Sequence, residues 1–216
     1  MSRIAIVAVV FVLGSAVWLL AGARGQFLVG GALVSAGVRI QDHLEPYDFV
    51  HPDATESPEQ VWAEFEQQNE LSSKVWERFP RTTEHPMVAL LVCMDARLDT
   101  TELAGDTRGY YYVVRTAGSV LGPEEQEMLE LAVANGVKLV VLTRHTDCAA
   151  ERAAREPGMR EQFPALTRGV LEREQRVAEF LARPLIAERI SRGELLVKQR
   201  VIETGSEQLL AAFPIR

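Results

Sequence analysis

Cysteine is scarce in this chain, because the 216 residues include only Cys93 and Cys148. Two cysteines allow at most one disulfide, so multiple cross-links are excluded. The two thiols either pair with each other, stay buried and reduced, or serve as ligands. A disulfide would leave the neighbouring Asp95, Arg97 and His145 without a role, and this favours the ligand interpretation.

Basic residues are also in the minority. The chain has 23 lysines and arginines against 30 aspartates and glutamates, which gives a formal net charge of −7. The first 40 residues contain three arginines and no acid, so residues 41–216 carry 20 basic and 30 acidic side chains, a net charge of −10. This acidic balance argues against a nucleic-acid partner. No internal repeat or low-complexity tract appears.

The N-terminus lacks charge over a long stretch. Residues 4–23 contain no charged side chain, and about twenty apolar residues suffice to cross a bilayer as a helix. A second apolar run, residues 27–38, follows Arg24. The first run is a signal peptide with a cleavage site at residues 21–23, a single uncleaved anchor, or one arm of a helical hairpin. We favour the anchor, because the run is long for a signal peptide.

The location of the protein follows from this segment only in part. Arg3 on one side of the run and Arg24 and Arg39 on the other give little bias, so the orientation in the membrane stays open. We expect a membrane-associated protein, or an exported or periplasmic one if the segment is a signal peptide. Residues 41–56 contain two prolines and several acids without a period, which predicts a linker.

A helix is predicted to begin after Ser57. This serine stands at the N-cap position, Pro58 at the first helical position and Gln60 at the third. The helix either packs its apolar side chains on its own domain or contacts a second copy of the chain, and we favour the second copy. The apolar residues with helical spacing are Val61, Trp62, Phe65, Leu71, Val75, Trp76 and Phe79, and Pro80 follows them.

Two later stretches have the pattern of buried strands that end in reactive side chains. Residues 87–92 precede Cys93-Met94-Asp95-Ala96-Arg97, and residues 137–142 precede His145-Thr146-Asp147-Cys148. Ligands gather at the carboxyl ends of parallel strands, so neighbouring strands would bring the two cysteines and the histidine together. Two thiolates and one imidazole suit zinc. Three protein ligands leave a fourth position for water, as in catalytic zinc sites.

The paired pattern C-x-D-x-R and H-x-x-C resembles the β-class carbonic anhydrases, and Arg-Thr-Ala-Gly at residues 115–118 is similar to the R-x-A-G segment of that family. The resemblance covers about residues 57–208. It implies an α/β fold for residues 57–216, with a mainly parallel β-sheet flanked by helices. It also implies a zinc ion held by Cys93, His145 and Cys148, and a homodimer or higher homo-oligomer in which N-terminal helices embrace the partner subunit.

The same resemblance implies the reversible hydration of carbon dioxide to bicarbonate by a zinc-bound hydroxide. Asp95 and Arg97 would act as a catalytic dyad, in which Asp95 orients the hydroxide and Arg97 holds the carboxylate away from the metal. One alternative is a hydrolase of carbonyl sulfide or carbon disulfide on the same fold. Another is a membrane-tethered zinc-binding module without catalysis, against which the intact set of five residues argues.

The chain departs from this family at several positions. Arg144 and Ala149 stand where the family usually has glycine, so we expect Arg144 to place a charge near the pocket mouth and Ala149 to narrow the helix start. Thr116 and Ser119 stand where asparagine is frequent, which affects substrate contacts rather than the metal. We interpret Asp147 as a loop cap and not as a ligand.

The remaining elements are predicted from periodicity and from proline and glycine positions. Residues 150–155 should form a polar helix with charges facing solvent, ended by Pro157-Gly158, and residues 167–183 one long helix that continues beyond Pro184. Two further strands at residues 110–114 and 195–202, and a helix at residues 123–133 closed by Asn135-Gly136, complete the predicted domain.

Overall fold

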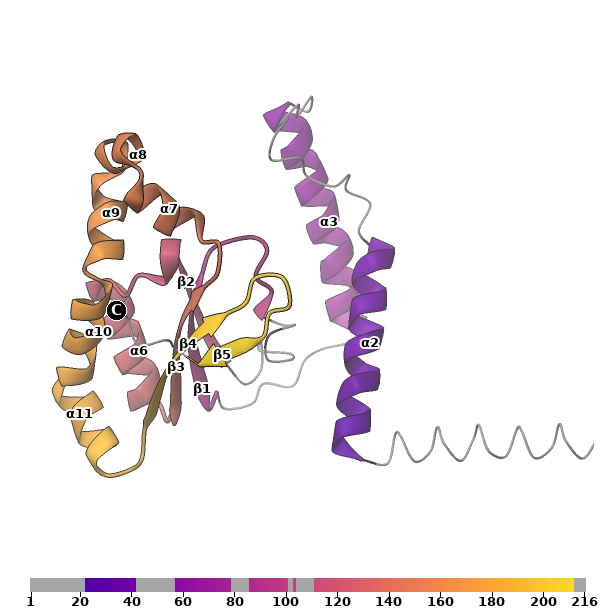
Figure 1. Ribbon diagram of the computed structural model, residues 1–216. Helices are drawn as coiled ribbons and strands as arrows, with labels where there is room; N and C mark the ends of the chain where they lie inside the picture. Colours follow the sequence, from indigo (N-terminus) through magenta and orange to yellow (C-terminus); the bar gives the residue numbers. More distant parts are fainter. Residues whose placement is uncertain (1–21, 42–56, 79–85, 101–102, 104–110, 212–216) are drawn as a thin grey trace, which may run out of the picture. The chain divides into compact units, whose positions relative to one another are not determined.

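The structure is a computed structural model that describes residues 22–41, 57–78, 86–100, 103 and 111–211. The chain divides into two compact units, residues 1–79 and residues 80–216. The first unit contains the helices α2 (Ala23–Gln41) and α3 (Pro58–Arg78), and the second contains the β-sheet (Figure 1). The predicted domain boundary at residue 57, before α3, stays a prediction.

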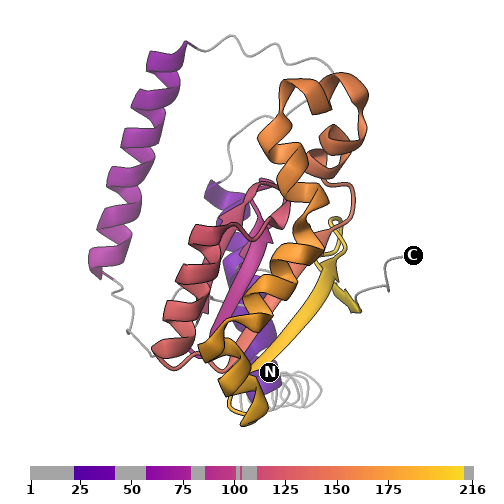
Figure 2. The same ribbon diagram turned by 90° about the vertical axis from the view of Figure 1, so that its left-hand side faces the viewer.

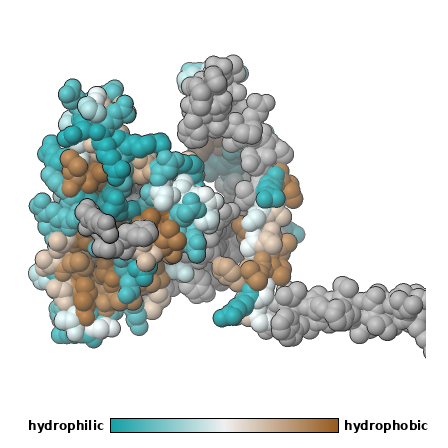
Figure 3. Space-filling model, in the orientation of Figure 1, coloured by the Kyte–Doolittle hydropathy of each residue, from teal (hydrophilic) through white to brown (hydrophobic). Residues whose placement is uncertain are grey.

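Helix α2 includes the second apolar run of the N-terminal region. Several of its apolar side chains are exposed, among them Phe27, Leu33 and Ile40, and Figure 3 shows apolar surface along this helix. Within the described ranges, no helix combines the length and the apolarity that crossing a membrane requires. The first run, residues 4–23, falls almost entirely outside the described residues, and so does the predicted linker. Membrane attachment through that run stays a prediction.

Helix α3 begins as its sequence predicts. The Gln60 backbone N–H donates to Ser57 Oγ over 3.3 Å, and the Ser57 N–H donates to Gln60 Oε1 over 2.7 Å, so the two residues cap each other. The rings of Trp62 and Phe65 stack with centroids 5.9 Å apart, and both side chains are more than half exposed. The described apolar side chains of α3 are each at least half exposed, namely Val61, Trp62, Phe65, Leu71 and Val75.

The second unit is built on one five-stranded sheet with the order β2-β1-β3-β4-β5. The first four strands of that order run parallel, and β5 pairs antiparallel with β4. The predicted mainly parallel α/β fold is therefore confirmed (Figures 1 and 2). The strands are β1 (Val88–Cys93), β2 (Tyr111–Thr116), β3 (Leu139–His145), β4 (Leu196–Ile202) and β5 (Leu209–Ala211).

The crossover from β3 to β4 differs from the predicted one. The expected long helix is two helices, because the backbone at Glu172 leaves helical geometry with φ −86° and ψ 3°. The predicted polar helix ends at Arg155, before Pro157, and Pro157 then begins a further helix, since the first helical position needs no N–H donor. Besides the short turn η1 (Ala117–Ser119), the helices are α6 (Pro123–Ala134), α7 (Ala149–Arg155), α8 (Pro157–Gln162), α9 (Pro164–Leu171), α10 (Arg173–Ala182) and α11 (Pro184–Ser191).

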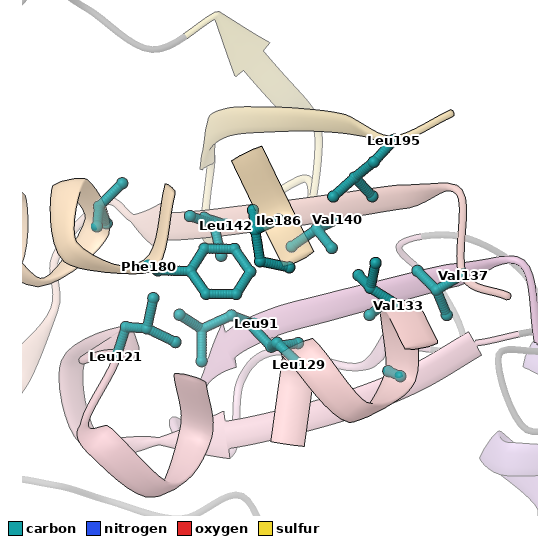
Figure 4. Packing of buried hydrophobic residues seen from close by; sticks show 13 residues of the cluster. Leu91, Leu121, Leu129, Val133, Val137, Val140, Leu142, Phe180, Ile186 and Leu195 are labelled. Carbon is teal, nitrogen blue, oxygen red and sulfur yellow. The ribbon is translucent and has the colours of Figure 1, made fainter. Parts of the chain in front are cut away.

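The main core lies between one face of the sheet and the helices α6, α10 and α11. Side chains of a strand alternate between the two faces, so Leu91 and Val140 point toward these helices. Phe180 on α10 and Ile186 on α11 are fully buried against this face of the sheet, and Figure 4 shows the packing at close range. The opposite face carries a smaller cluster that includes Leu90, Val92, Leu98, Val141, Ile202 and both cysteines.

Helix α6 offers a matched test of this core. Leu129 is fully buried, whereas Leu131 is 54% exposed on the same helix. We expect Leu129→Ala to lower the free energy of unfolding by about 2–5 kcal/mol through lost packing and a cavity. Leu131→Ala should change it by no more than about 0.5 kcal/mol. Urea unfolding followed by circular dichroism measures both, and equal effects would contradict the core assignment.

Candidate metal centre

The polar side chains of interest lie where the strand order of the sheet reverses. The chain runs from β1 to β2 on one side, then crosses over through α6 to β3 on the other side of β1. Loops that leave β1 and β3 therefore diverge, and open α/β sheets bind ligands in the crevice that this leaves at the carboxyl ends. Cys93 is the last residue of β1 and His145 the last residue of β3.

Three side chains meet at this point. The sulfur atoms of Cys93 and Cys148 and a ring nitrogen of His145 all lie within 4.8 Å of one another, and all three residues are buried. Both cysteines are free thiols. The structure thus brings together the three residues that the sequence suggested as ligands, and the group could hold a metal ion. Its donor set of two sulfurs and one nitrogen suits zinc.

Thr204 fixes the orientation of the His145 ring. His145 Nδ1 lies 3.2 Å from Thr204 Oγ1, and the Thr204 hydroxyl in turn donates to the carbonyl of Thr146. The hydroxyl oxygen then accepts from Nδ1–H, which leaves the lone pair on Nε2. That Nε2 atom is buried and has no hydrogen-bond partner among the described residues. A buried ring nitrogen with an available lone pair, beside two thiols, is the arrangement that a metal site requires.

The two cysteines differ in the pKa of their thiols. Hydrogen bonds from the Cys148 thiol and from the backbone N–H groups of Asp95 and Gly118 outweigh burial and lower the pKa of Cys93 below its ordinary value. The Gly118 N–H lies 3.3 Å from Cys93 Sγ. The neighbouring Cys93 sulfur and burial raise the pKa of Cys148. One thiolate is therefore formed readily, and a bound cation would favour the second.

Asp95 and Arg97 lie beside this group and bind each other tightly. Arg97 Nη2 and Nε donate to the two carboxylate oxygens of Asp95 over 2.8 and 2.9 Å. These bonds lower the pKa of Asp95 to about 2 from its ordinary 3.8. The stability that the pair contributes is therefore complete above about pH 3.8 and is lost as the pH falls through about 2. Asp95 Oδ2 also lies 4.0 Å from His145 Nε2, so the carboxylate faces the ligand group.

Asp147 does more than cap its loop, because it also binds Arg97. Its carboxylate accepts from Arg97 Nη1 and its carbonyl from Arg97 Nη2, each over 3.0 Å. The same carboxylate accepts from Arg152 over 2.5 Å, and the bond from Arg97 is the main reason why the pKa of Asp147 is lowered. The backbone at Asp147 is left-handed, with φ 57°. Asp147 is not among the ligand atoms, but it holds the far side of the Arg97 guanidinium.

Comparison with known proteins places this geometry in a family. The profile of the family described as carbonic anhydrase matches residues 88–212, more than half of the chain and all five strands. The chain belongs to the carbonic anhydrase family. The predicted resemblance is therefore confirmed, and the family match falls within the second compact unit.

Individual relatives agree with this assignment. The β-carbonic anhydrases 1 of Mycobacterium bovis and Mycobacterium tuberculosis are 36% identical over 64 residues, which is 28% of this chain. The chain spans 38% of the length of these curated relatives. The fold resembles that of the β-carbonic anhydrase CcaA with a TM-score of 0.55 and 19% identity, over 71% of this chain and 94% of that chain. For the β-carbonic anhydrase of Aspergillus fumigatus the TM-score is 0.53 at 22% identity, over 71% and 92%.

At one of the two positions where the chain lacks the usual glycine of the family, Arg144 is held by an ion pair. Arg144 does not project freely as a charge, because its guanidinium donates to Glu151 over 3.1 and 3.3 Å. Glu151 was expected to face solvent with the rest of its helix, and that expectation is wrong. Burial by itself raises the pKa of Glu151, but the bonds from Arg144 and Arg173 outweigh it and lower that pKa.

Proposed function

We propose that this chain is a zinc enzyme that hydrates carbon dioxide reversibly to bicarbonate. The observation that carries the proposal is the buried group of Cys93, His145 and Cys148 beside an Asp95–Arg97 pair, in a member of the carbonic anhydrase family. The unpartnered His145 Nε2 and the two thiols supply three ligand atoms. A fourth position is then left for water.

Zinc held by these residues would supply a water molecule of lowered pKa and a positive charge for the developing bicarbonate. The chain's own contribution begins with Asp95. Its carboxylate is ionised at neutral pH and lies toward the ligand group, so it can accept a hydrogen bond from the attacking water. That bond fixes the direction of the lone pair that attacks the carbon of carbon dioxide.

Arg97 decides where the Asp95 carboxylate lies. A carboxylate two residues from a metal ligand is itself an acceptable zinc ligand and would fill the position needed by water. Two parallel hydrogen bonds from the planar guanidinium occupy both oxygens of Asp95. Asp147 accepts two further hydrogen bonds from the guanidinium and keeps it in place.

We also propose a homo-oligomer, with α3 in the contact. The support is the exposed apolar stripe of that helix, which includes the stacked pair Trp62 and Phe65. The β-carbonic anhydrases of Sordaria macrospora, which share the fold with a TM-score of 0.51, are described as tetrameric.

The activity itself is tested with the purified full chain. Loaded with zinc, it should bind about one zinc ion per chain, and stopped-flow assays should show hydration of carbon dioxide. Cys148→Ser should lose most of the zinc and the activity, because one of three ligands is gone. Carbonyl sulfide is offered in parallel. Hydrolysis of carbonyl sulfide without hydration of carbon dioxide would replace the proposed substrate, and neither activity from a zinc-loaded chain would overturn the proposal.

Arg97→Ala tests the dyad. The variant should keep its zinc but lose activity about 10–100-fold, because Asp95 is no longer held away from the metal. In the metal-free protein, carbon-13 NMR should show the pKa of Asp95 rising from about 2 toward 3.8. Arg192→Ala, which removes an exposed arginine that pairs with Glu188, serves as the control and should change neither quantity. Normal turnover in Arg97→Ala would mean that the pair does not control the metal site.

Phe65→Ser tests the assembly. Light scattering during size-exclusion chromatography should give a multiple of the chain mass for the parent and a smaller particle for this variant, since an apolar contact is lost. Glu66→Ala, at an exposed neighbouring position of α3, is the control and should assemble like the parent. A monomeric parent at micromolar concentration would contradict the proposed oligomer.

A further inference from the structure

Arg173 is a buried cation that the proposed reaction does not use. It stands at the first position of α10, and only 6% of the residue is exposed. Arginine is almost never buried to this degree unless its charge is paired. The surroundings of this guanidinium therefore indicate what it holds in place.

The guanidinium of Arg173 joins two segments. Its Nη1 donates to Glu151 Oε1 over 2.7 Å, and its Nη2 donates to the carbonyl of Gly118 over 2.6 Å. Glu151 lies on α7, which begins directly after the ligand Cys148, and Gly118 lies in the turn that follows β2. The Arg173 side chain thus connects the helix that follows Cys148 with the turn that contacts Cys93.

Gly118 is the residue through which this connection reaches the metal centre. Its backbone N–H donates to Cys93 Sγ over 3.3 Å, while its carbonyl accepts from Arg173. Its φ of 65° is left-handed, and an added Cβ would lie 3.1 Å from Ala150 Cβ and 3.3 Å from Val170. The turn therefore packs closely against these neighbours, and the bond from Arg173 to the Gly118 carbonyl helps to hold the backbone conformation in which the Gly118 N–H faces Cys93 Sγ.

We infer that Arg173 is a positioning residue of the metal centre, which holds the Gly118 carbonyl so that the Gly118 N–H stays on the Cys93 sulfur. A hydrogen bond to a metal-binding sulfur stabilises its thiolate form and fixes its direction, and such outer contacts affect metal affinity. Glu151 balances the charge of Arg173 in its buried position. The inference rests on the proposed function only in requiring that the centre takes zinc.

The test compares Arg173→Met with Arg176→Met in the full chain. Arg176 lies one turn further along α10 and pairs with Glu172 of the preceding turn, so it is a matched control. Zinc affinity is measured by competition with a chromophoric chelator. We expect the affinity of Arg173→Met to fall about 10–100-fold and that of Arg176→Met to stay at the parental value. In the cobalt-substituted protein, the sulfur-to-cobalt charge-transfer band should shift only in Arg173→Met, because only that variant changes the bonding of the sulfur.

Arg173→Lys covers the case in which Arg173→Met does not fold. Lysine keeps the charge beside Glu151, but its single ammonium cannot span Glu151 and Gly118 as the two arms of a guanidinium do. Its zinc affinity should fall and its cobalt band should shift as well. A folded Arg173→Met or Arg173→Lys protein with the affinity and the cobalt spectrum of the parent would overturn the inference. A parent that binds zinc without hydrating carbon dioxide would overturn the proposed function and leave this inference standing.

Discussion

The parallel pairing of β1 with β3 is the constraint on which the site depends. The two strands pair from Val88 with Leu139 to Leu91 with Leu142, so their carboxyl ends finish at the same edge of the sheet. Cys93 and His145 are the last residues of these strands, so the pairing places both at this edge. A slip of one residue would move one strand end relative to the other by about 3.3 Å along the strands. The apolar residues that bury both strands therefore also fix the register of the ligands.

Beyond the strand ends, two arginines hold separate segments next to each other, as strand pairing does within the sheet. Arg97 connects Asp95 with Asp147, and Arg173 connects Glu151 with Gly118. A guanidinium presents donors on several edges of a rigid plane, so it can bind two segments in fixed directions at once. The ligand loops gain defined geometry in this way without further secondary structure. A lysine at either position would keep the charge and lose that second connection.

Much of the site could be predicted from the sequence, because the residue patterns that identify it lie within short segments. Cysteine and histidine at the ends of apolar runs identify ligand types and strand ends within a few residues, and the Ser57–Gln60 capping pair lies within one helical turn. The contacts made by Thr204 and Arg173 are different, because their partners lie 59 and 55 residues away in the chain. Threonine and arginine are common on surfaces, and residue type alone does not predict which distant groups these two contact. The break at Glu172 likewise involves no proline or glycine.

The sequence by itself determined the α/β class, the family resemblance and the identity of the three ligand residues, since residue type and strand period are properties of short segments. Only the tertiary structure decided that Glu151 is partly buried in ion pairs rather than solvent-facing, that Asp147 holds Arg97, and that Arg173 reaches the turn beside Cys93. Each of these depends on two segments that meet only after the sheet and its crossover helices have packed. The free energy of a buried charge is set by the partners that packing supplies, and those partners are absent from the local sequence.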